Sequence, residues 1–112
     1  MSQLTTHILD TTVGKPAAGV AIILFHQGVD GWTEIAKGNT NKDGRVADLL
    51  QKETLLEHGV YKIRFETKPY FDGLNTRSFY PFVEIAFEIN SSDHYHVPLL
   101  LNPFGFSTYR GS

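Results

Sequence analysis

This chain of 112 residues contains no cysteine. The fold cannot rest on disulfides or on a cysteine-based zinc site, and no thiol nucleophile is available. The absence fits any cellular compartment. Structure and chemistry must therefore come from other residue types.

Concentrated positive charge and long apolar runs are also missing. The formal net charge is −2 and lysine and arginine are not clustered, so we expect no nucleic acid partner. The apolar runs fall far short of the roughly 20 residues that a membrane-spanning helix needs, so we expect no membrane partner. The first ten residues lack a basic segment followed by an apolar one. This predicts a cytoplasmic location, or a periplasmic one if a signal was removed before residue 1.

Several familiar catalytic motifs are absent as well. The sequence contains no Gly-X-Ser-X-Gly elbow, no phosphate-binding glycine-rich loop and no His-Glu-X-X-His helix. If the chain is an enzyme, its expected chemistry is attack by a water molecule, with histidine as the proton carrier.

The sequence does contain apolar material for one core and regular β-type patterning. Hydrophobic residues make up 41% of the chain and charged residues 20%, and residues 1–112 are predicted to form a single domain. Alternation in residues 59–67 directs Tyr61, Ile63 and Phe65 toward the core. Six further segments are predicted to be strands: residues 4–9, 20–26, 32–37, 82–89, 94–101 and 104–109. Residues 45–50 are predicted to be a short strand or an irregular edge. This density of short strands is typical of an all-β sandwich or small barrel.

Helical signals are few. Residues 69–74 are predicted to form one short helix, because proline stands at the first turn and glycine near the end. Residues 54–57 could add a single helical turn.

The segment 97–101 is apolar on both faces of its predicted strand. Val97, Leu99 and Leu101 point one way, and Pro98 and Leu100 point the other. A strand in an antiparallel sandwich normally turns one polar face to water. With so few helical residues available, a second subunit is the simplest cover, and we expect a homo-oligomer.

Histidine and arginine provide the candidate chemistry. His94 and His96 are two residues apart on a predicted strand and share a face, and with His7 they could bind a metal ion. A His-X-His pair is more often exposed to solvent or satisfied within the core than bound to a metal. Arg45 follows the turn dipeptide Asp43-Gly44 and is either a solvated charge or a donor to an oxygen-rich ligand.

Three separated segments together resemble one family. These are LTTHILD (residues 4–10), NKDGR (residues 41–45) and HYHVPLLLNPFGFSTYRGS (residues 94–112). They resemble the transthyretin-related proteins, whose enzyme branch hydrolyses the cyclic amide of 5-hydroxyisourate during urate degradation. The terminal Tyr-Arg-Gly-Ser is the most specific part, because the hormone-carrying transthyretins lack it.

The resemblance implies a fold, an assembly and a site. It implies a transthyretin-like sandwich of two four-stranded sheets with one short helix, assembled as a homotetramer that is a dimer of dimers. Active sites are then expected in the channel between dimers, with no cofactor and no metal. The residues that the resemblance makes catalytic are His7, Arg45 and His96. Those that it makes substrate-binding are Tyr109, Arg110, Gly111 and Ser112.

The resulting hypothesis is a hydrolysis in which His7 and His96 polarise a water molecule. Arg45 and the end at Tyr109-Arg110 would hold the substrate oxygens and stabilise the developing negative charge. The product would be 2-oxo-4-hydroxy-4-carboxy-5-ureidoimidazoline. Three rival interpretations stay open: a non-catalytic carrier of small molecules, a metal-dependent hydrolase using His7, His94 and His96, and a purely structural module.

Overall fold

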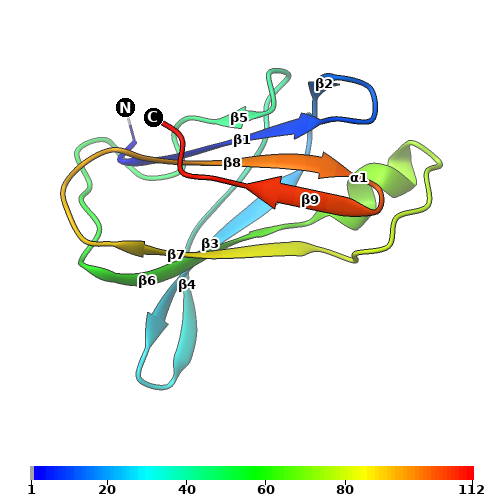
Figure 1. Ribbon diagram of the computed structural model, residues 1–112. Coiled ribbons are helices and arrows are strands. Elements are labelled where there is room, and N and C mark those ends of the chain that lie inside the picture. The colour runs from blue at the N-terminus through cyan, green and yellow to red at the C-terminus, as the bar shows by residue number, and fades with distance from the viewer. Residues whose placement is uncertain (1) are drawn as a thin grey trace.

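Two β-sheets and one short helix make up the computed structural model, which describes residues 2–112 (Figure 1). The helix is α1 (Thr67–Gly73). The strands are β1 (Leu4–Asp10), β2 (Lys15–Pro16), β3 (Ala21–Gly28), β4 (Gly31–Asn39), β5 (Arg45–Val46), β6 (Gly59–Phe65), β7 (Val83–Ile89), β8 (Tyr95–Asn102) and β9 (Gly105–Thr108). None of the helical segments within residues 2–112 is long and apolar enough to span a bilayer.

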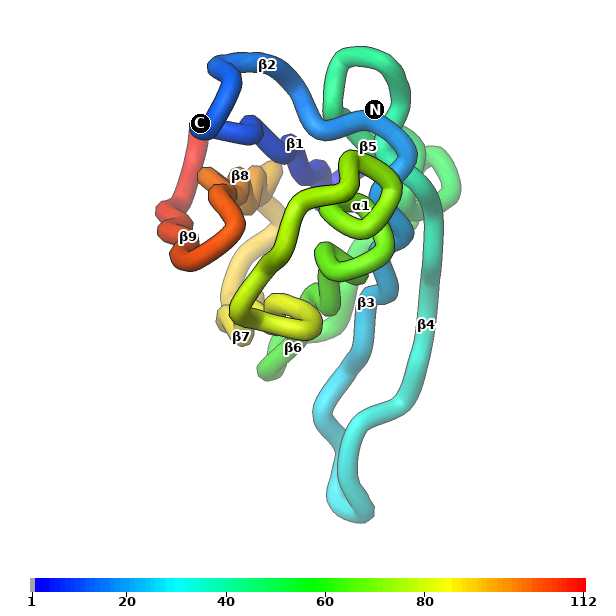
Figure 2. Tube along the Cα trace, turned by 90° about the vertical axis from the view of Figure 1, so that its right-hand side faces the viewer, coloured from blue at the N-terminus to red at the C-terminus, as the bar shows by residue number. Residues whose placement is uncertain are grey.

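The strand order places the two ends of the sequence beside each other. One sheet has the order β2-β1-β8-β9, with β5 also paired to β1, and the other has the order β4-β3-β6-β7. The β1–β8 ladder is parallel, and the remaining ladders are antiparallel. Figure 2 shows the two sheets as separate layers, with the β3–β4 hairpin projecting beyond the sandwich.

Strand alternation fills the space between the sheets. Ile22 and Leu24 of β3 are fully buried, as are Ile63 of β6 and Leu99 of β8. The predicted inward face of residues 59–67 is confirmed, because Tyr61, Ile63 and Phe65 are all buried while the residues between them are only partly covered. Burial of these side chains supplies the main driving force for the sandwich.

The helix closes one end of the sandwich. Phe71 is buried against the core, and the hydroxyl group of Tyr70 donates a hydrogen bond to Asp10 Oδ2 at 2.8 Å. The Asp10 carboxylate is itself buried at the end of β1. Burial and this hydrogen bond raise the pKa of Tyr70, so the phenol stays protonated and keeps α1 joined to β1.

The predicted all-β sandwich with one helix is confirmed, with corrections to its minor elements. The site-bearing sheet gains two-residue strands, β2 and β5, so it has five strands and not four. The predicted strand 45–50 ends at Val46, because Leu49 and Leu50 turn into the core. No helical turn forms at residues 54–57, since the backbone N–H of Leu56 donates to Gln3 Oε1 at 2.8 Å.

Candidate active site

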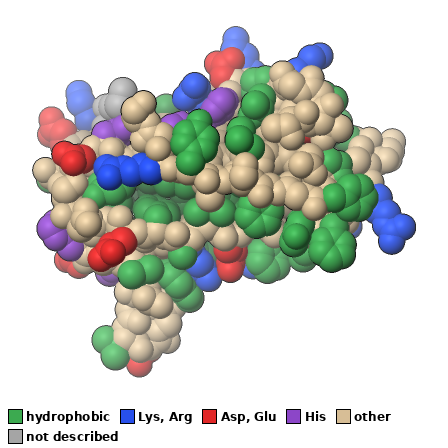
Figure 3. All heavy atoms as spheres, viewed as in Figure 1, with side chains coloured by type: hydrophobic (Ala, Val, Ile, Leu, Met, Phe, Trp, Pro, Cys, Tyr) green, Lys and Arg blue, Asp and Glu red, His purple; other side chains and the backbone are tan. Residues whose placement is uncertain are grey.

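The three residues predicted to be catalytic lie on one outer face of the β1–β8 sheet. His7 lies directly opposite Arg45 in the β1–β5 ladder. Thr5, two residues before His7, lies opposite His96 in the β1–β8 ladder. Since side chains two apart on a strand share a face, this register gathers all four side chains on the same side. Figure 3 shows histidine side chains along this part of the surface.

A hollow of about 260 Å³ opens between these strands, and we call it the histidine hollow. Its lining includes Thr5, Arg45, Ala47, His94, His96 and Ser112. The volume lies just below the roughly 300–1,000 Å³ typical of small-molecule sites. The chain therefore carries a shallow hollow that is open to solvent and brings imidazole, guanidinium and hydroxyl groups together on a partly apolar surface.

His96 is held both through its ring and through its backbone. Its Nδ1 lies 2.8 Å from Thr5 Oγ1, and the same hydroxyl oxygen lies 3.0 Å from His94 Nε2. On the other side, the backbone N–H of Gly111 donates to the His96 carbonyl at 2.8 Å. A Cβ atom at Gly111 would lie 2.6 Å from His96 Cδ2, so only glycine lets the chain pass this close to the ring. Gly111 thus shapes the site through packing.

Both histidines of the predicted pair favour the neutral form. Partial burial and the nearby Arg45 cation lower the pKa of His7. Partial burial lowers the pKa of His96 too, followed by the positive charges of Arg45, His7 and His94. A neutral imidazole can accept a proton, so each ring is ready at neutral pH to serve as a base.

The position of Arg45 depends on the turn that precedes it. Asn41 Oδ1 accepts hydrogen bonds from the backbone N–H groups of Asp43 at 2.9 Å and Arg45 at 3.1 Å. Gly44 has φ +73° and its carbonyl accepts the Ile8 N–H at 2.8 Å. The turn is therefore tied to β1, which fixes where the guanidinium group begins.

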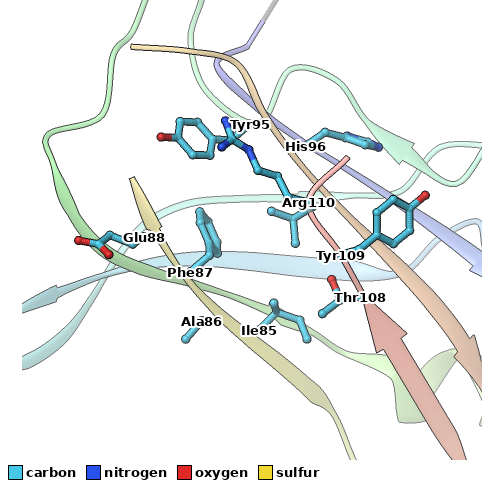
Figure 4. Close-up of a pocket in the computed structure, with 10 residues that line it drawn as sticks. Ile85, Ala86, Phe87, Glu88, Tyr95, His96, Thr108, Tyr109 and Arg110 are labelled. Carbon is cyan, nitrogen blue, oxygen red and sulfur yellow. The ribbon is translucent and has the colours of Figure 1, made fainter. Parts of the chain in front are cut away.

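The four C-terminal residues divide between two places. Ser112 lines the histidine hollow with Arg45 and His96. Tyr109 and Arg110 line a second groove, between β7 and β8, where the Arg110 guanidinium carbon lies 4.3 Å from the ring centroid of Tyr95. Figure 4 shows Arg110 over Tyr95, while His96 and Tyr109 point the other way. Arg110 therefore lies over Tyr95, outside the hollow that Arg45 lines.

Two residues beside His96 are not predicted from the sequence in this role. The sequence does not single out Thr5, and it suggests His94 only as a metal ligand. In residues 2–112, no group of three or more His, Cys, Asp or Glu side chains is arranged to hold a metal ion. The available signal for Thr5 is its spacing of two from His7, which places it on the same face of the strand.

The fold and this hollow together define a class: a β-sandwich carrying imidazole and guanidinium groups on the outer face of one sheet. The family model described as HIUase/Transthyretin matches residues 4–111. The chain belongs to the HIUase/Transthyretin family, which confirms the resemblance seen in its sequence.

Named relatives include both branches of this family. The chain is 49% identical to the "Probable 5-hydroxyisourate hydrolase" of Schizosaccharomyces pombe, over 97% of this chain and 90% of the relative. The solved structure of 5-hydroxyisourate hydrolase from Klebsiella pneumoniae superposes with TM-score 0.86 at 38% identity, covering 97% of this chain and 98% of that one. Sea bream transthyretin, solved in complex with thyroxine, superposes with TM-score 0.91 at 33% identity, covering 98% and 95%.

Proposed function

We propose that this protein hydrolyses 5-hydroxyisourate to 2-oxo-4-hydroxy-4-carboxy-5-ureidoimidazoline in urate degradation. The observation that carries the proposal is the meeting of His7, Arg45 and His96 on one face of the β1–β8 sheet. The identity of nearly half the residues to a probable hydrolase of this substrate supports it.

The chemistry follows from the charges of the three groups. A neutral imidazole of the His7/His96 pair takes a proton from water as the oxygen attacks the ring carbonyl. Arg45 stays cationic and stabilises the negative charge that develops on the carbonyl oxygen. The other imidazole returns a proton to the leaving ring nitrogen. No covalent intermediate with the protein is needed.

The substrate-binding part of the proposal rests on the C-terminal residues. Ser112 lies in the histidine hollow and can offer its hydroxyl group to a substrate oxygen. Gly111 brings the backbone against His96. Tyr109 is exposed in the second groove and Arg110 lies over Tyr95, so both would act at the rim or across a subunit boundary.

A homotetramer, a dimer of dimers, is part of the proposal because one subunit leaves the site open. The outer face that carries the histidines continues into Pro98 and the half-buried Leu100, which are apolar. Pro98 is already buried within the chain, so a second subunit packed on this face would cover Leu100 and close the histidine hollow into a channel. The partner would supply the wall that the 260 Å³ hollow lacks.

A carrier function is the rival with a specific observation in its favour, namely the TM-score of 0.91 to a thyroxine-bound transthyretin. Backbone similarity does not separate the two functions, since one fold hosts both. The side chains do: two imidazoles and a guanidinium group make the face suited to proton transfer and anion stabilisation. These groups favour the hydrolase.

The deciding experiment generates 5-hydroxyisourate in place from urate and follows its decay by ultraviolet absorbance. Acceleration over the spontaneous rate is expected. Decay at the spontaneous rate, at protein concentrations that bind the substrate, would leave the carrier as the better assignment. Dialysis against EDTA tests the metal-dependent alternative, which requires activity to vanish and return with zinc.

A further inference from the structure

Thr5 forms a bridge between two imidazole rings. Its Oγ1 lies 2.8 Å from His96 Nδ1 and 3.0 Å from His94 Nε2. The ring planes differ by only 17° and the ring centroids are 6.5 Å apart. His96 is half-buried in the histidine hollow, whereas His94 is exposed. The three side chains thus form a hydrogen-bonded path from the site to solvent.

A hydroxyl group carries one hydrogen, so the bridge has a direction. When Thr5 donates to His94 Nε2, it must accept from a hydrogen on His96 Nδ1, which leaves His96 Nε2 with a free lone pair. When Thr5 donates to His96 Nδ1, the neutral His96 ring carries its hydrogen on Nε2. The first arrangement makes His96 a base at Nε2, and the second makes it an acid there.

We propose that Thr5 and His94 are positioning residues that set the tautomer of His96 and conduct its proton to solvent. The inference rests on the proposed hydrolysis for its catalytic meaning. Neither side chain needs to touch the substrate, because both act through His96.

The proton steps balance. His96 Nε2 takes a proton from the attacking water while Nδ1 passes its own proton to Thr5. Thr5 passes its hydrogen to His94 Nε2, and His94 Nδ1 releases a proton to solvent. The second water proton reaches the leaving nitrogen through His7. Amide opening at neutral pH yields a carboxylate and one net proton, and that proton is the one the path removes.

The surrounding charges give the path a favourable direction. On the site side, His96 faces the Arg45 cation and His7. On the solvent side, His94 also lines a separate surface depression, together with the acidic Glu53. A proton moving from His96 to His94 therefore leaves the ring on which the Arg45 cation acts and reaches an exposed ring that shares a surface depression with an acidic side chain.

The primary test is nitrogen-15 NMR of the histidine rings in the whole protein, which reports tautomers without any substrate. Thr5→Val removes the hydroxyl group at nearly constant shape, and Thr5→Ser keeps it. We expect the His96 ring shifts to change in Thr5→Val and in His94→Gln, and to stay near the wild-type values in Thr5→Ser. Thr33→Val and His58→Gln, at exposed positions elsewhere, are the matched controls. Identical His96 shifts in wild type, Thr5→Val and His94→Gln would overturn the proposal.

Kinetics then separate this inference from the proposed function. Thr5→Val should lower kcat by about tenfold with little change in KM, a part of the roughly 10²–10⁴-fold that acid–base catalysis contributes. Thr5→Ser should restore most of that loss. The protein could show His96 ring shifts that respond to Thr5→Val and His94→Gln and yet fail to accelerate 5-hydroxyisourate decay. That result would refute the hydrolase function and support the hydrogen-bonded path. Full activity in Thr5→Val would refute the path and leave the hydrolase standing.

Discussion

At the scale of residues, burial and the Arg45 cation together favour the neutral form of the neighbouring histidines. Partial burial and the Arg45 cation lower the pKa of both His7 and His96. A lowered pKa means that the folded protein binds protons less readily at these rings than the unfolded chain does. The contribution of these two histidines to the free energy of unfolding is therefore complete above pH 6.5, the ordinary histidine pKa. It falls as the pH drops through their lower pKa values in the folded protein.

The first prediction follows from that coupling. Activity should rise with pH along an acidic limb below pH 6.5 and then level off, because the base must be neutral. Arg45→Gln should move that limb to higher pH and lower kcat/KM by orders of magnitude. The pKa of each histidine can also be measured without substrate, from proton NMR shifts of the imidazole rings recorded against pH. Arg77→Gln, at an exposed site, is the control; an unmoved His96 titration in Arg45→Gln would contradict the electrostatic role.

Gly111 allows a second prediction at this scale. Alanine there would place Cβ 2.6 Å from His96 Cδ2, so the imidazole must move. A displacement near 1 Å can cost about a hundredfold in rate, and we expect Gly111→Ala to lower kcat/KM by about tenfold to a hundredfold. Gly105→Ala meets only ordinary contacts at 3.7 Å and serves as the control. Equal turnover in the two variants would show that the ring position at His96 does not matter.

At the scale of elements, the turn before β5 is the most constrained support of the site. Gly44 holds φ +73°, and a Cβ atom there would lie 2.5 Å from the Ile8 carbonyl oxygen. Any side chain at this position would strain the turn and push it off β1.

Gly44→Ala should therefore destabilise the protein and displace Arg45. A left-handed conformation alone costs an alanine about 1–2 kcal/mol, and the contact with Ile8 adds to it. For a chain of this size we expect Tm to fall by roughly 5–15 °C, measured by thermal denaturation. Gly73→Ala, with no atoms within 4 Å of its Cβ position, should leave Tm nearly unchanged. A Gly44→Ala protein as stable as Gly73→Ala would mean that the turn relaxes freely.

Elements with local signals were predictable, and those with distant partners were not. Alternation identified the inward face of Tyr61, Ile63 and Phe65 because each strand carries that pattern in itself. Lys15–Pro16 carries no strand signal, and it pairs only because Leu9 and Asp10 lie beside it. The site needed the family resemblance, since nothing local to either strand shows that β1 and β8 are adjacent.

The direction of Arg110 shows the same limit at the site. Its closeness in sequence to Ser112 suggests one shared site for both residues. The chain, however, passes His96 at Gly111, whose backbone N–H binds the His96 carbonyl, and the residues before and after that contact line different hollows. The ring of Tyr95 holds the guanidinium group of Arg110 through a cation–π contact at 4.3 Å. Gly111 and Arg110 find these partners in β8, outside the C-terminal segment itself. No local pattern therefore predicts that Arg110 and Ser112 line different hollows.

At the scale of the whole molecule, the outer face of β8 determines assembly in the proposed tetramer. Leu100 is half-buried on this face and is not among the residues that form or pack against the described core. Leu100→Glu should split the tetramer, because burying a carboxylate at a subunit contact is strongly unfavourable. Sedimentation velocity should show smaller species, and activity should fall with them.

Val29→Glu at the fully exposed β3–β4 tip is the matched charge control and should remain assembled. Circular dichroism of both variants checks that the subunit fold is kept. A Leu100→Glu protein that sediments like the Val29→Glu control would remove this face from the interface.

The parallel β1–β8 ladder also limits how early the sheet that carries the site can be completed. Thr5 and His96 are separated by 91 positions in the chain. Ribosomes add about 5–20 residues per second, so β1 waits roughly 5–20 seconds before its main partner exists. In that interval β1 can pair only with the two-residue strands β2 and β5, leaving a long unpaired edge open to wrong partners. The strands β8 and β9 therefore complete the sheet and the site together, and the incomplete sheet keeps an unpaired edge until they are available.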